Sequence, residues 1–305
     1  MDATEDLAVL AQRFDADRQH LRSVAFQLLG SAADAEDAVQ SAWLKASASD
    51  FAVVENLTGW FTTITAHEAV DQLRARQRRP ERPLLEPADL DERVAAAADE
   101  EALLADSVSR ALQVVLDRLS PAQRVAFVLH DVFAVPFETV GELLDRSPVA
   151  AKKLASRARG RLMPDPAVRT ERTAEHVKIV EAFLAASRGG DIGVLLQLLA
   201  PDVVRRVDRS LVPDDVPTEV RGAREVADET RRFTHRAASG VVLLIDGIPG
   251  IVLAPAGRVQ ALLQIRIGDD DRIHEVDIRS DPERLANAVF TLPFWSSQDG
   301  LGAIG

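Results

Sequence analysis

The chain has no cysteine and no tyrosine, and only 5% of its 305 residues are aromatic. Without cysteine it has no disulfides, no thiolate metal ligands and no cysteine nucleophile. Because aromatic rings are scarce, aliphatic side chains must fill the cores, and a hydrophobic content of 47% is ample for that. We expect no bound metal and no cofactor.

Long apolar runs are also missing. None approaches the roughly 20 residues that a membrane span needs, and the first residues are acidic where a secretory signal would be basic. The sequence therefore predicts a soluble, cytoplasmic protein with no membrane partner. A length of 305 residues is sufficient for two or three domains.

Positive charge is scarce overall, since the formal net charge is -12. Contact with nucleic acid nevertheless needs only a local basic surface. Residues 74–79 supply one such surface with four arginines, and residues 152–161 supply another with two lysines and three arginines. Acidic stretches separate the two, which indicates two separate contacts.

Residues 1–80 are predicted to form a helical domain, because apolar residues recur at helical spacing. Gly30 ends the first helix, and Ser31 or Asp34 is expected to cap the second. A third helix is expected over about 57–77, with arginines at its end, which is favourable for cations whatever the function. Prolines then open an acidic linker over residues 81–107.

Residues 108–165 are predicted to form a second helical domain. Ser120-Pro121 marks a helix start, and helices are expected over 122–131 and 137–144. After a three-residue turn, Pro148 opens the last helix. A helix, a short turn and a helix form the helix-turn-helix pattern of DNA-binding proteins.

The last of these helices has a basic face. Val149, Leu154 and Leu162 are expected to point inward, opposite lysines and arginines that can reach phosphates and base edges. The free backbone amides at its start, together with Ser147, are suited to hold a phosphate. A solvated basic helix in an ordinary bundle is the alternative that this pattern alone leaves open.

The chain changes character at about residue 172. Two amphipathic helices precede a series of strand signals, with one more helix at about 221–232. This order predicts an α+β domain over 172–293, in which helices cover one face of a meander of antiparallel strands. Residues 294–305 are expected to form a tail. The predicted fold is thus two all-α domains followed by an α+β domain.

Three sequence blocks resemble one protein family. Residues 31–46 read SAADAEDAVQSAWLKA and resemble region 2.2 of the extracytoplasmic-function (ECF) sigma factors of the sigma-70 family. Residues 56–79 read NLTGWFTTITAHEAVDQLRARQRR and resemble regions 2.3 and 2.4. From Leu119, the stretch LSPAQRVAFVLHDVFAVPFETVGELLDRSPVAAKKLASRARGRL resembles region 4. The resemblance covers about residues 5–165 and implies two partners, core RNA polymerase (its β′ clamp and β flap) and promoter DNA.

In such factors the region 2.2 helix binds the β′ clamp. The resemblance places this site at Asp34, Asp37, Gln40, Trp43, Leu44 and Lys45. A charged, amphipathic helix is suited to meet a coiled coil. Burial in the core explains Trp43 equally well, because a tryptophan on an apolar helix stripe is usually buried.

Regions 2.3 and 2.4 of the family capture the −10 promoter element as single strand, where an unstacked base needs a pocket or a stacking surface. The resemblance places this site at Asn56, Trp60, Thr63, His67, Arg74, Arg76 and Arg78. Residues 66–67 are a small residue followed by histidine, which departs from many relatives. The sequence preference at the −10 element is therefore expected to differ. His67 is explained equally well as a solvated surface residue.

Region 4 of the family reads the −35 element in the major groove. The resemblance places this site at Ser147, Lys152, Lys153, Ser156, Arg157, Arg159 and Arg161. Lysine at reading positions favours guanine acceptors, whereas Arg159 and Arg161 are expected at phosphates. The linker is implied to follow the RNA exit path, with a solvated tether as the alternative for any one carboxylate.

Residues 172–293 resemble the SnoaL-like cone domain that several ECF groups carry as an extension. The resemblance implies that this domain modulates the sigma factor in cis. It also implies interdomain contacts at Leu85, Glu86, Pro87, Asp281 and Pro282. The family's D-G-G-G-K motif is replaced here by residues 208–212, DRSLV, so the contact of that motif is expected to be absent or remade.

Related cones include enzymes that abstract protons in an apolar pocket. Asp208, Asp277, His235 and His274 are available, but their spacing identifies no dyad, and tyrosine, a frequent oxyanion donor there, is absent. We expect no catalytic residues and no enzyme activity. Binding of an unknown small ligand in the cone is the alternative that the sequence leaves open, because such cones are concave and apolar.

The sequence thus predicts a transcription initiation factor that binds core polymerase, recognises −35 and −10 elements and promotes DNA melting. The alternative is a SnoaL-like ligand sensor or enzyme fused to a helix-turn-helix repressor or activator. Region 2 discriminates between them, since a repressor has no use for a clamp-binding helix followed by a tryptophan-containing melting segment.

Overall fold

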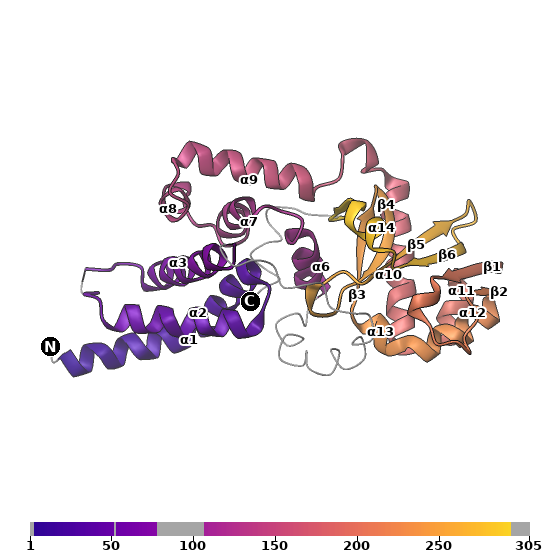
Figure 1. Ribbon diagram of the computed structural model, residues 1–305, viewed down its shortest axis with the longest axis horizontal. Coiled ribbons are helices and arrows are strands. Elements are labelled where there is room, and N and C mark those ends of the chain that lie inside the picture. Colours follow the sequence, from indigo (N-terminus) through magenta and orange to yellow (C-terminus); the bar gives the residue numbers. More distant parts are fainter. Residues whose placement is uncertain (1–2, 52, 78–106, 294–305) are drawn as a thin grey trace.

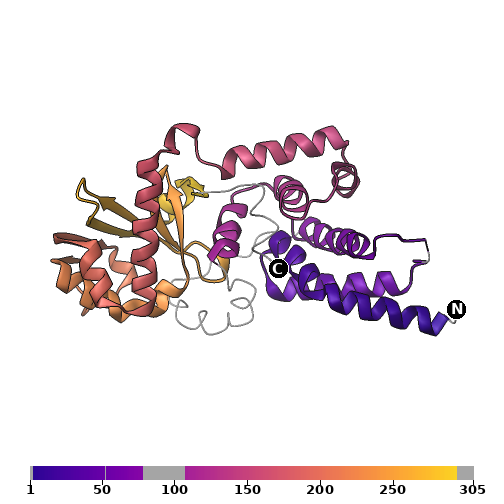
Figure 2. The same cartoon turned by 180° about the vertical axis from the view of Figure 1, so that it is seen from behind.

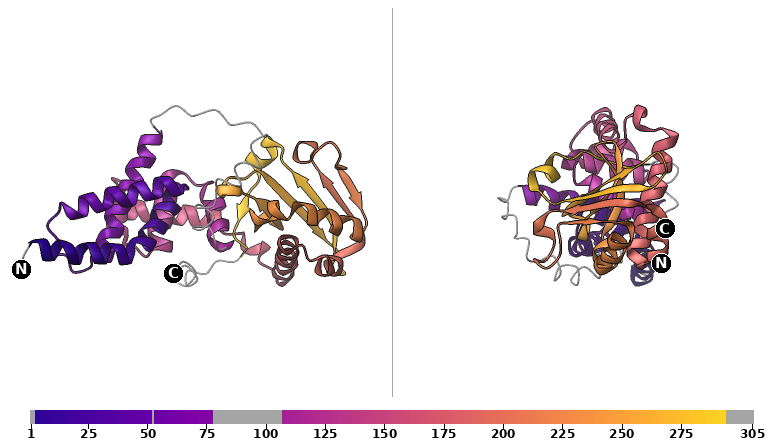
Figure 3. Two further views of the ribbon diagram at one scale, coloured as in Figure 1. Left: turned by 90° about the horizontal axis from the view of Figure 1, so that it is seen from below. Right: turned by 90° about the vertical axis from the view of Figure 1, so that its right-hand side faces the viewer.

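The computed structural model describes residues 3–51, 53–77 and 107–293 (Figure 1). The molecule is elongated, with helical domains at one end and a sheet at the other (Figure 3). In the described ranges, no helix combines the length and the apolar character that a membrane crossing requires. Several residues of the predicted sites lie outside the described residues, namely Arg78, Leu85, Glu86 and Pro87.

Three helices form the first domain, α1 (Ala3–Leu29), α2 (Ala32–Ser47) and α3 (Leu57–Gln77). Gly30 ends α1 with a φ of 71°, a left-handed conformation that is open to glycine. The Ser31 hydroxyl then accepts a hydrogen bond from the Asp34 amide at 3.3 Å. The predicted helix limits are confirmed, and of the two expected caps the structure uses Ser31.

The second domain consists of five helical elements, in chain order α6 (Ser107–Leu116), α7 (Pro121–Phe127), the π-helical turn η2 (Val128–Val132), α8 (Phe137–Leu143) and α9 (Pro148–Leu162). Ser120 and Gln123 form a reciprocal capping box at the start of α7. A Cβ on Gly141 would lie 2.8 Å from the carbonyl oxygen of Arg146, so glycine lets the turn close tightly. The helix-turn-helix is confirmed, whereas the helix expected over 122–131 widens to π-helix in its second half.

The third domain combines helices with a seven-stranded sheet. Its helical elements are η3 (Pro166–Val168), α10 (Glu171–Gly189), α11 (Ile192–Leu198), η4 (Arg209–Leu211), α12 (Ala223–Thr230), η5 (Arg231–Phe233), α13 (Thr234–Ala238), η6 (Pro255–Gly257) and α14 (Pro282–Asn287). Its strands are β1 (Leu199–Val207), β2 (Glu219–Arg221), β3 (Gly240–Ile245), β4 (Ile248–Leu253), β5 (Ala261–Ile267), β6 (Ile273–Arg279) and β7 (Phe290–Thr291). The predicted α+β class is confirmed.

The strand order is β2-β1-β6-β5-β4-β3-β7. Strands β3 to β6 form the expected antiparallel meander. The prediction of an entirely antiparallel sheet is wrong, because β1 pairs with β6 in parallel. A parallel pair needs a long connection, and the chain provides one, since α12, α13 and the strands β3 to β5 lie between β1 and β6.

One face of the sheet is buried. The other is buried over β3, β4 and the start of β5, whereas Arg206, Glu275 and Arg266 leave it partly exposed over β1, β6 and the end of β5. Figure 2 shows α10 crossing one face, where Phe183 and Leu195 pack with Ile251 and Val276 in one core. The other face belongs to a second core that continues through α6 into the helical domains, so that Leu243 and the buried side chains of α1 share one cluster. The third domain is therefore packed against the second rather than only tethered to it.

Candidate nucleic-acid and polymerase interfaces

Helix α9 presents its basic face to solvent. Its buried side is a stripe of small and aliphatic residues, Ala151, Ala155, Ala158 and Leu162. On the opposite side Lys152, Lys153, Ser156 and Arg157 are all exposed. Within the part of the chain that the structure describes, no acidic group pairs with these lysines or with Arg157. The structure therefore leaves this face available to DNA in the free protein.

The start of α9 is defined by Ser147 and Pro148. The Ser147 hydroxyl accepts a hydrogen bond from the Ala150 amide at 3.2 Å, so this side chain caps the helix. Pro148 has no amide hydrogen to leave unpaired in the first turn. A phosphate at this helix end would meet the remaining free amides rather than the Ser147 hydroxyl.

Val149 does not point inward, so that prediction is wrong. Its side chain is 65% exposed, whereas Leu162 is buried and Leu154 packs partly against the core. The reason is the helical repeat: two residues turn the helix by about 200°, so Val149 lies opposite Ala151. An apolar, β-branched side chain thus lies on the basic surface of α9.

Two of the predicted −35 residues are engaged within their own domain. Arg159 lies 3.3 Å from Asp131, and Arg161 donates to the side-chain oxygen of Gln123 at 3.1 Å. Burial raises the pKa of Asp131, and the charge of Arg159 opposes that rise. These two arginines fix the C-terminal half of α9 on α7 and η2, whereas Lys152 and Lys153 are unconstrained.

The predicted polymerase site is a groove between α1 and α2. Trp43 lies half-buried on Phe14, with their ring centroids 5.2 Å apart, and lines the groove together with Gln40 and Leu44. Leu44 is 68% exposed, which is unusual for so large an apolar side chain. Trp43 therefore packs on the core and also borders an open groove, so the two interpretations of this residue are compatible.

The charged members of this predicted site behave differently. Asp37 is exposed on α2, and Asp34 lies in the first turn, where a carboxylate is favourable. Lys45 forms an ion pair with Glu68 of α3. The hydrogen bond that Lys45 donates to the Glu68 carboxylate raises the pKa of Lys45. Lys45 thus links α2 to α3 in the free protein.

The predicted −10 residues follow one face of α3. Asn56 caps the helix, with its side-chain oxygen 3.0 Å from the Gly59 amide. Trp60, Thr63, His67 and Arg74 are spaced by three, four and seven residues and so share a face. Trp60 is half-buried beside Phe61, and His67 is exposed. The structure thus aligns an aromatic ring, a hydroxyl and two basic side chains along one face of α3.

Arg74 bridges the two helical domains. Its guanidinium donates to the carboxylate of Asp145 at 2.7 Å and to the carbonyl oxygen of Leu143 at 3.2 Å. Both acceptors belong to the helix-turn-helix, at the end of α8 and in the turn before α9. Arg76 lies in the last turn of α3. The contact of Arg74 was not foreseen, because nothing local in sequence pairs residues so far apart.

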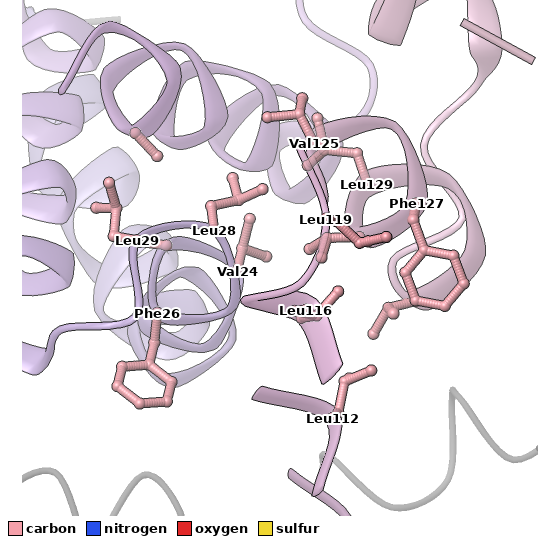
Figure 4. Packing of buried hydrophobic residues seen from close by; sticks show 14 of the residues in the cluster. Val24, Phe26, Leu28, Leu29, Leu112, Leu116, Leu119, Val125, Phe127 and Leu129 are labelled. Atoms are coloured by element: carbon pink, nitrogen blue, oxygen red, sulfur yellow. The ribbon is translucent and has the colours of Figure 1, made fainter. Parts of the chain in front are cut away.

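The packing of the two helical domains extends beyond Arg74. Figure 4 shows Val24 and Leu28 of α1 directed toward Leu116 and Leu119 of the second domain. In the same contact, Arg124 Nε donates to the carbonyl oxygen of Gln27 at 3.0 Å. All these apolar groups belong to one buried cluster. The two domains are in direct contact through an apolar interface with a buried hydrogen bond.

The third domain docks on the second through α6 and the end of α9. Arg118 donates to the carbonyl oxygen of Leu285 at 2.7 Å, and Arg110 donates to that of Ala238. The Leu292 amide donates to the carbonyl oxygen of Leu162 at 2.9 Å. Asp281 and Pro282, the predicted interdomain residues, cap and begin α14 and are exposed. The contact itself lies a few residues further along the chain.

The titratable residues considered for catalysis in this domain are dispersed. Asp208 and Asp277 both bind the guanidinium of Arg279, at 3.2 and 2.9 Å. His274 lies 2.9 Å from Asp270 at a surface turn, and His235 is exposed on α13. This arrangement places Asp208 and Asp277 in an ion-pair network and gives neither histidine an apolar pocket.

Comparisons with known proteins match both halves of the helical part. The sequence profile of Sigma-70 region 2 matches residues 14–79, and that of Sigma-70 region 4 matches residues 109–162. The ECF RNA polymerase sigma factor SigJ of Mycobacterium tuberculosis (strain ATCC 25618 / H37Rv) is 40% identical over 229 residues, which cover 72% of this chain and 70% of SigJ.

Two further comparisons extend over most of the chain. The probable ECF RNA polymerase sigma factor SigI of the same strain is 30% identical over 268 residues, which cover 85% of this chain and 90% of SigI. The crystal structure of the M. tuberculosis ECF sigma factor SigJ is 31% identical, covers 90% of this chain and 98% of its own, and has a TM-score of 0.41.

The two sigma regions imply core RNA polymerase and promoter DNA as partners, and transcription initiation as the function. A repressor built on a helix-turn-helix alone does not account for region 2. The chain belongs to the ECF RNA polymerase sigma factors.

Proposed function

We propose that this sigma factor is held in a closed arrangement by contacts among its three domains, and that binding to core polymerase and promoter opens it. The observation that supports this most directly is the double contact of Arg74 with Asp145 and Leu143. In the closed protein, Arg74 is paired with the carboxylate of Asp145. In the open protein, the same arginine is expected to bind a DNA phosphate.

The spacing of promoter elements supports the need for opening. Elements centred at −10 and −35 lie about 25 base pairs apart, which is about 85 Å of duplex at about 3.4 Å per base pair. Region 2 and region 4 touch directly at Arg74 and Asp145, with 2.7 Å between the bonded atoms. One closed molecule therefore cannot place both domains on their elements at once.

The third domain supplies the restraint in this proposal. It shares a core with the helical domains and binds region 4 through Arg110 and Arg118. It leaves Lys152, Lys153 and Arg157 exposed. It therefore modulates activity by opposing domain separation, not by covering the basic helix, and this role requires no catalysis.

The finer assignments follow from the exposed surfaces. The groove beside Leu44 is assigned to the β′ clamp, and region 4 to the β flap. The −10 element is assigned to one face of α3, with Asn56, Trp60, Thr63, His67 and Arg74. The −35 element is assigned to α9, with Lys152, Lys153, Ser156 and Arg157, while Arg159 and Arg161 support the helix.

A covalent lock between the domains tests the proposal. The double variant Arg74→Cys, Asp145→Cys is joined by a short bis-maleimide, which reacts only there because the chain has no native cysteine. The locked protein should still bind core polymerase but should lose run-off transcription from a promoter with both elements. The matched control is the same variant capped with N-ethylmaleimide, which should transcribe. Equal transcription by the two forms contradicts the proposal.

A further inference from the structure

The third domain contains a partly open cavity of about 130 Å³ lined by residues of the sheet and of α10, α12 and α13. Figure 1 shows these helices beside the sheet. Its walls are mainly apolar and come from several elements, among them Leu184, Val226, Phe233, Ile251, Leu263 and Val276. An apolar cavity of this order holds a molecule about the size of a benzene ring.

An ion pair is buried in the cavity wall. Arg205 of β1 and Glu229 of α12 form a salt bridge, and their side chains are only 7% and 11% exposed. Arg205 has a further acceptor, since it donates to the carbonyl oxygen of Pro217 at 3.2 Å. Buried charges are costly unless every polar atom has a partner. Neither side chain meets that condition in full: among the described residues, Arg205 Nη2 has its ion pair with Glu229 but no hydrogen-bond partner, and Glu229 Oε1 has no hydrogen-bond partner.

Besides the ion-paired Arg205 Nη2, three buried polar atoms of the wall have no hydrogen-bond partner among the described residues: Glu229 Oε1, Gln260 Oε1 and Arg236 Nε. The wall hydroxyls are satisfied, because Ser187 donates to the Phe183 carbonyl and Thr230 to the Val226 carbonyl, each at 2.7 Å. Apart from Arg205 Nη2, which keeps its ion pair, the unsatisfied atoms are thus two acceptors and one donor.

We propose that this cavity binds a small, uncharged ring compound that carries a hydroxyl group, of the phenol or cyclic alcohol class. The apolar walls favour the ring. A hydroxyl suits the unsatisfied atoms, since it donates to a carboxylate or amide oxygen and accepts from a guanidinium. A ring without a hydroxyl leaves those atoms unpaired, and a site built on buried polar groups rejects such an analogue strongly.

Phenol and toluene form a matched pair of probes, because a methyl group replaces the hydroxyl on the same ring. Each is titrated into the full-length protein and followed by saturation-transfer NMR. Phenol should bind with a dissociation constant of about 1 mM, and toluene at least about tenfold more weakly. Equal binding of the two probes, or binding of neither, overturns the proposal. Neither measurement depends on polymerase, so the sigma function is tested separately.

Variants locate the bound probe. Gln260→Leu removes one acceptor at constant size and should weaken phenol binding about fivefold while leaving toluene binding unchanged. The matched control is Gln264→Leu on β5, because Gln264 does not line the cavity. Glu229→Gln is a poorer choice, since it strips Arg205 of its buried partner charge. Equal phenol affinity of Gln260→Leu, Gln264→Leu and the native chain overturns the proposed site.

Discussion

Arg118 lies over the ring of Phe290, with its guanidinium carbon 4.7 Å from the ring centroid. The same guanidinium donates to the carbonyl oxygens of Leu285 and Ala286 at the end of α14. Arg118 sits in the turn between α6 and α7, and Phe290 on β7, so one side chain joins region 4 to the third domain. Cations near a helix C-terminus and over an aromatic face are both stabilising.

Replacing Arg118 should weaken this docking. Arg118→Ala removes two charge-assisted hydrogen bonds and a cation–π contact, and we expect the free energy of unfolding to fall by about 2 kcal/mol. The measurement is urea denaturation followed by circular dichroism. Arg224→Ala on the exposed surface of α12 is the control and should cost less than about 0.5 kcal/mol. Similar losses for both variants would show that Arg118 does not hold the domains together.

The basic face of α9 is expected to read the −35 element. Lys152→Ala with Lys153→Ala should weaken binding of a −35 duplex by at least about tenfold and reduce the salt dependence by one to two counterions. Core-polymerase binding should not change. Fluorescence anisotropy over a salt series measures both effects. Lys178→Ala, an exposed lysine on α10, is the control, and an equal loss there would point to nonspecific charge.

Val149 is expected to contact a thymine methyl group, because an exposed apolar side chain on a reading helix matches that part of the major groove. Replacing thymine by uracil in the −35 duplex removes that methyl and should weaken binding by the native chain about fourfold. Val149→Ser should bind the two duplexes equally and keep its stability within about 0.5 kcal/mol. If replacing each thymine by uracil leaves the affinity of the native chain unchanged, the proposed contact of Val149 is ruled out.

Leu44 is expected to be an anchor for polymerase. Leu44→Ser should weaken binding to core RNA polymerase at least about tenfold, since exposed anchors carry much of the binding energy of an interface, and should leave stability nearly unchanged because the side chain is 68% exposed. Surface plasmon resonance on immobilised core measures the affinity. The control is Ile248→Ser in the third domain, where the side chain is 59% exposed. If Leu44→Ser binds core polymerase as tightly as the native chain, the polymerase site does not include Leu44.

His20 should make stability depend on pH. Its Nε2 lies 3.1 Å from the Thr62 hydroxyl, and its ring packs on Phe133 of region 4. Burial lowers the pKa of His20, although Asp17 opposes this. The unfolded chain therefore binds the proton more readily, so the contribution of His20 is present above its ordinary pKa of about 6.5 and is lost as pH falls from there toward the lowered pKa.

The measurement is the thermal midpoint of the native chain and of His20→Gln, at about pH 7.5 and about pH 5.5. The thermal midpoint of the native chain should fall more on acidification than that of the variant, which has no titrating group at this position. Other groups, such as Asp131, titrate in both proteins and cancel in the difference. If the thermal midpoint of the variant falls as much as that of the native chain, the acid sensitivity comes from another group.

The sequence by itself determined the local elements of this protein. Gly30 with Ser31, Ser120 with Pro121, and Ser147 with Pro148 mark helix ends, because a cap or a fixed φ acts within one turn of chain. The sigma motifs, read in order, indicated the family and its partners. The basic residues of α9 were likewise evident, since helical spacing alone places them on one face.

Only the tertiary structure decided how these elements meet. The parallel pairing of β1 with β6, the contact of Arg74 with region 4 and the ion pair of Arg205 with Glu229 in the cavity wall all escaped the sequence. Each depends on residues that are far apart in the chain, and no local propensity specifies which distant surface a side chain will meet. The closed arrangement belongs to this class, because it results from burial of apolar area shared by all three domains.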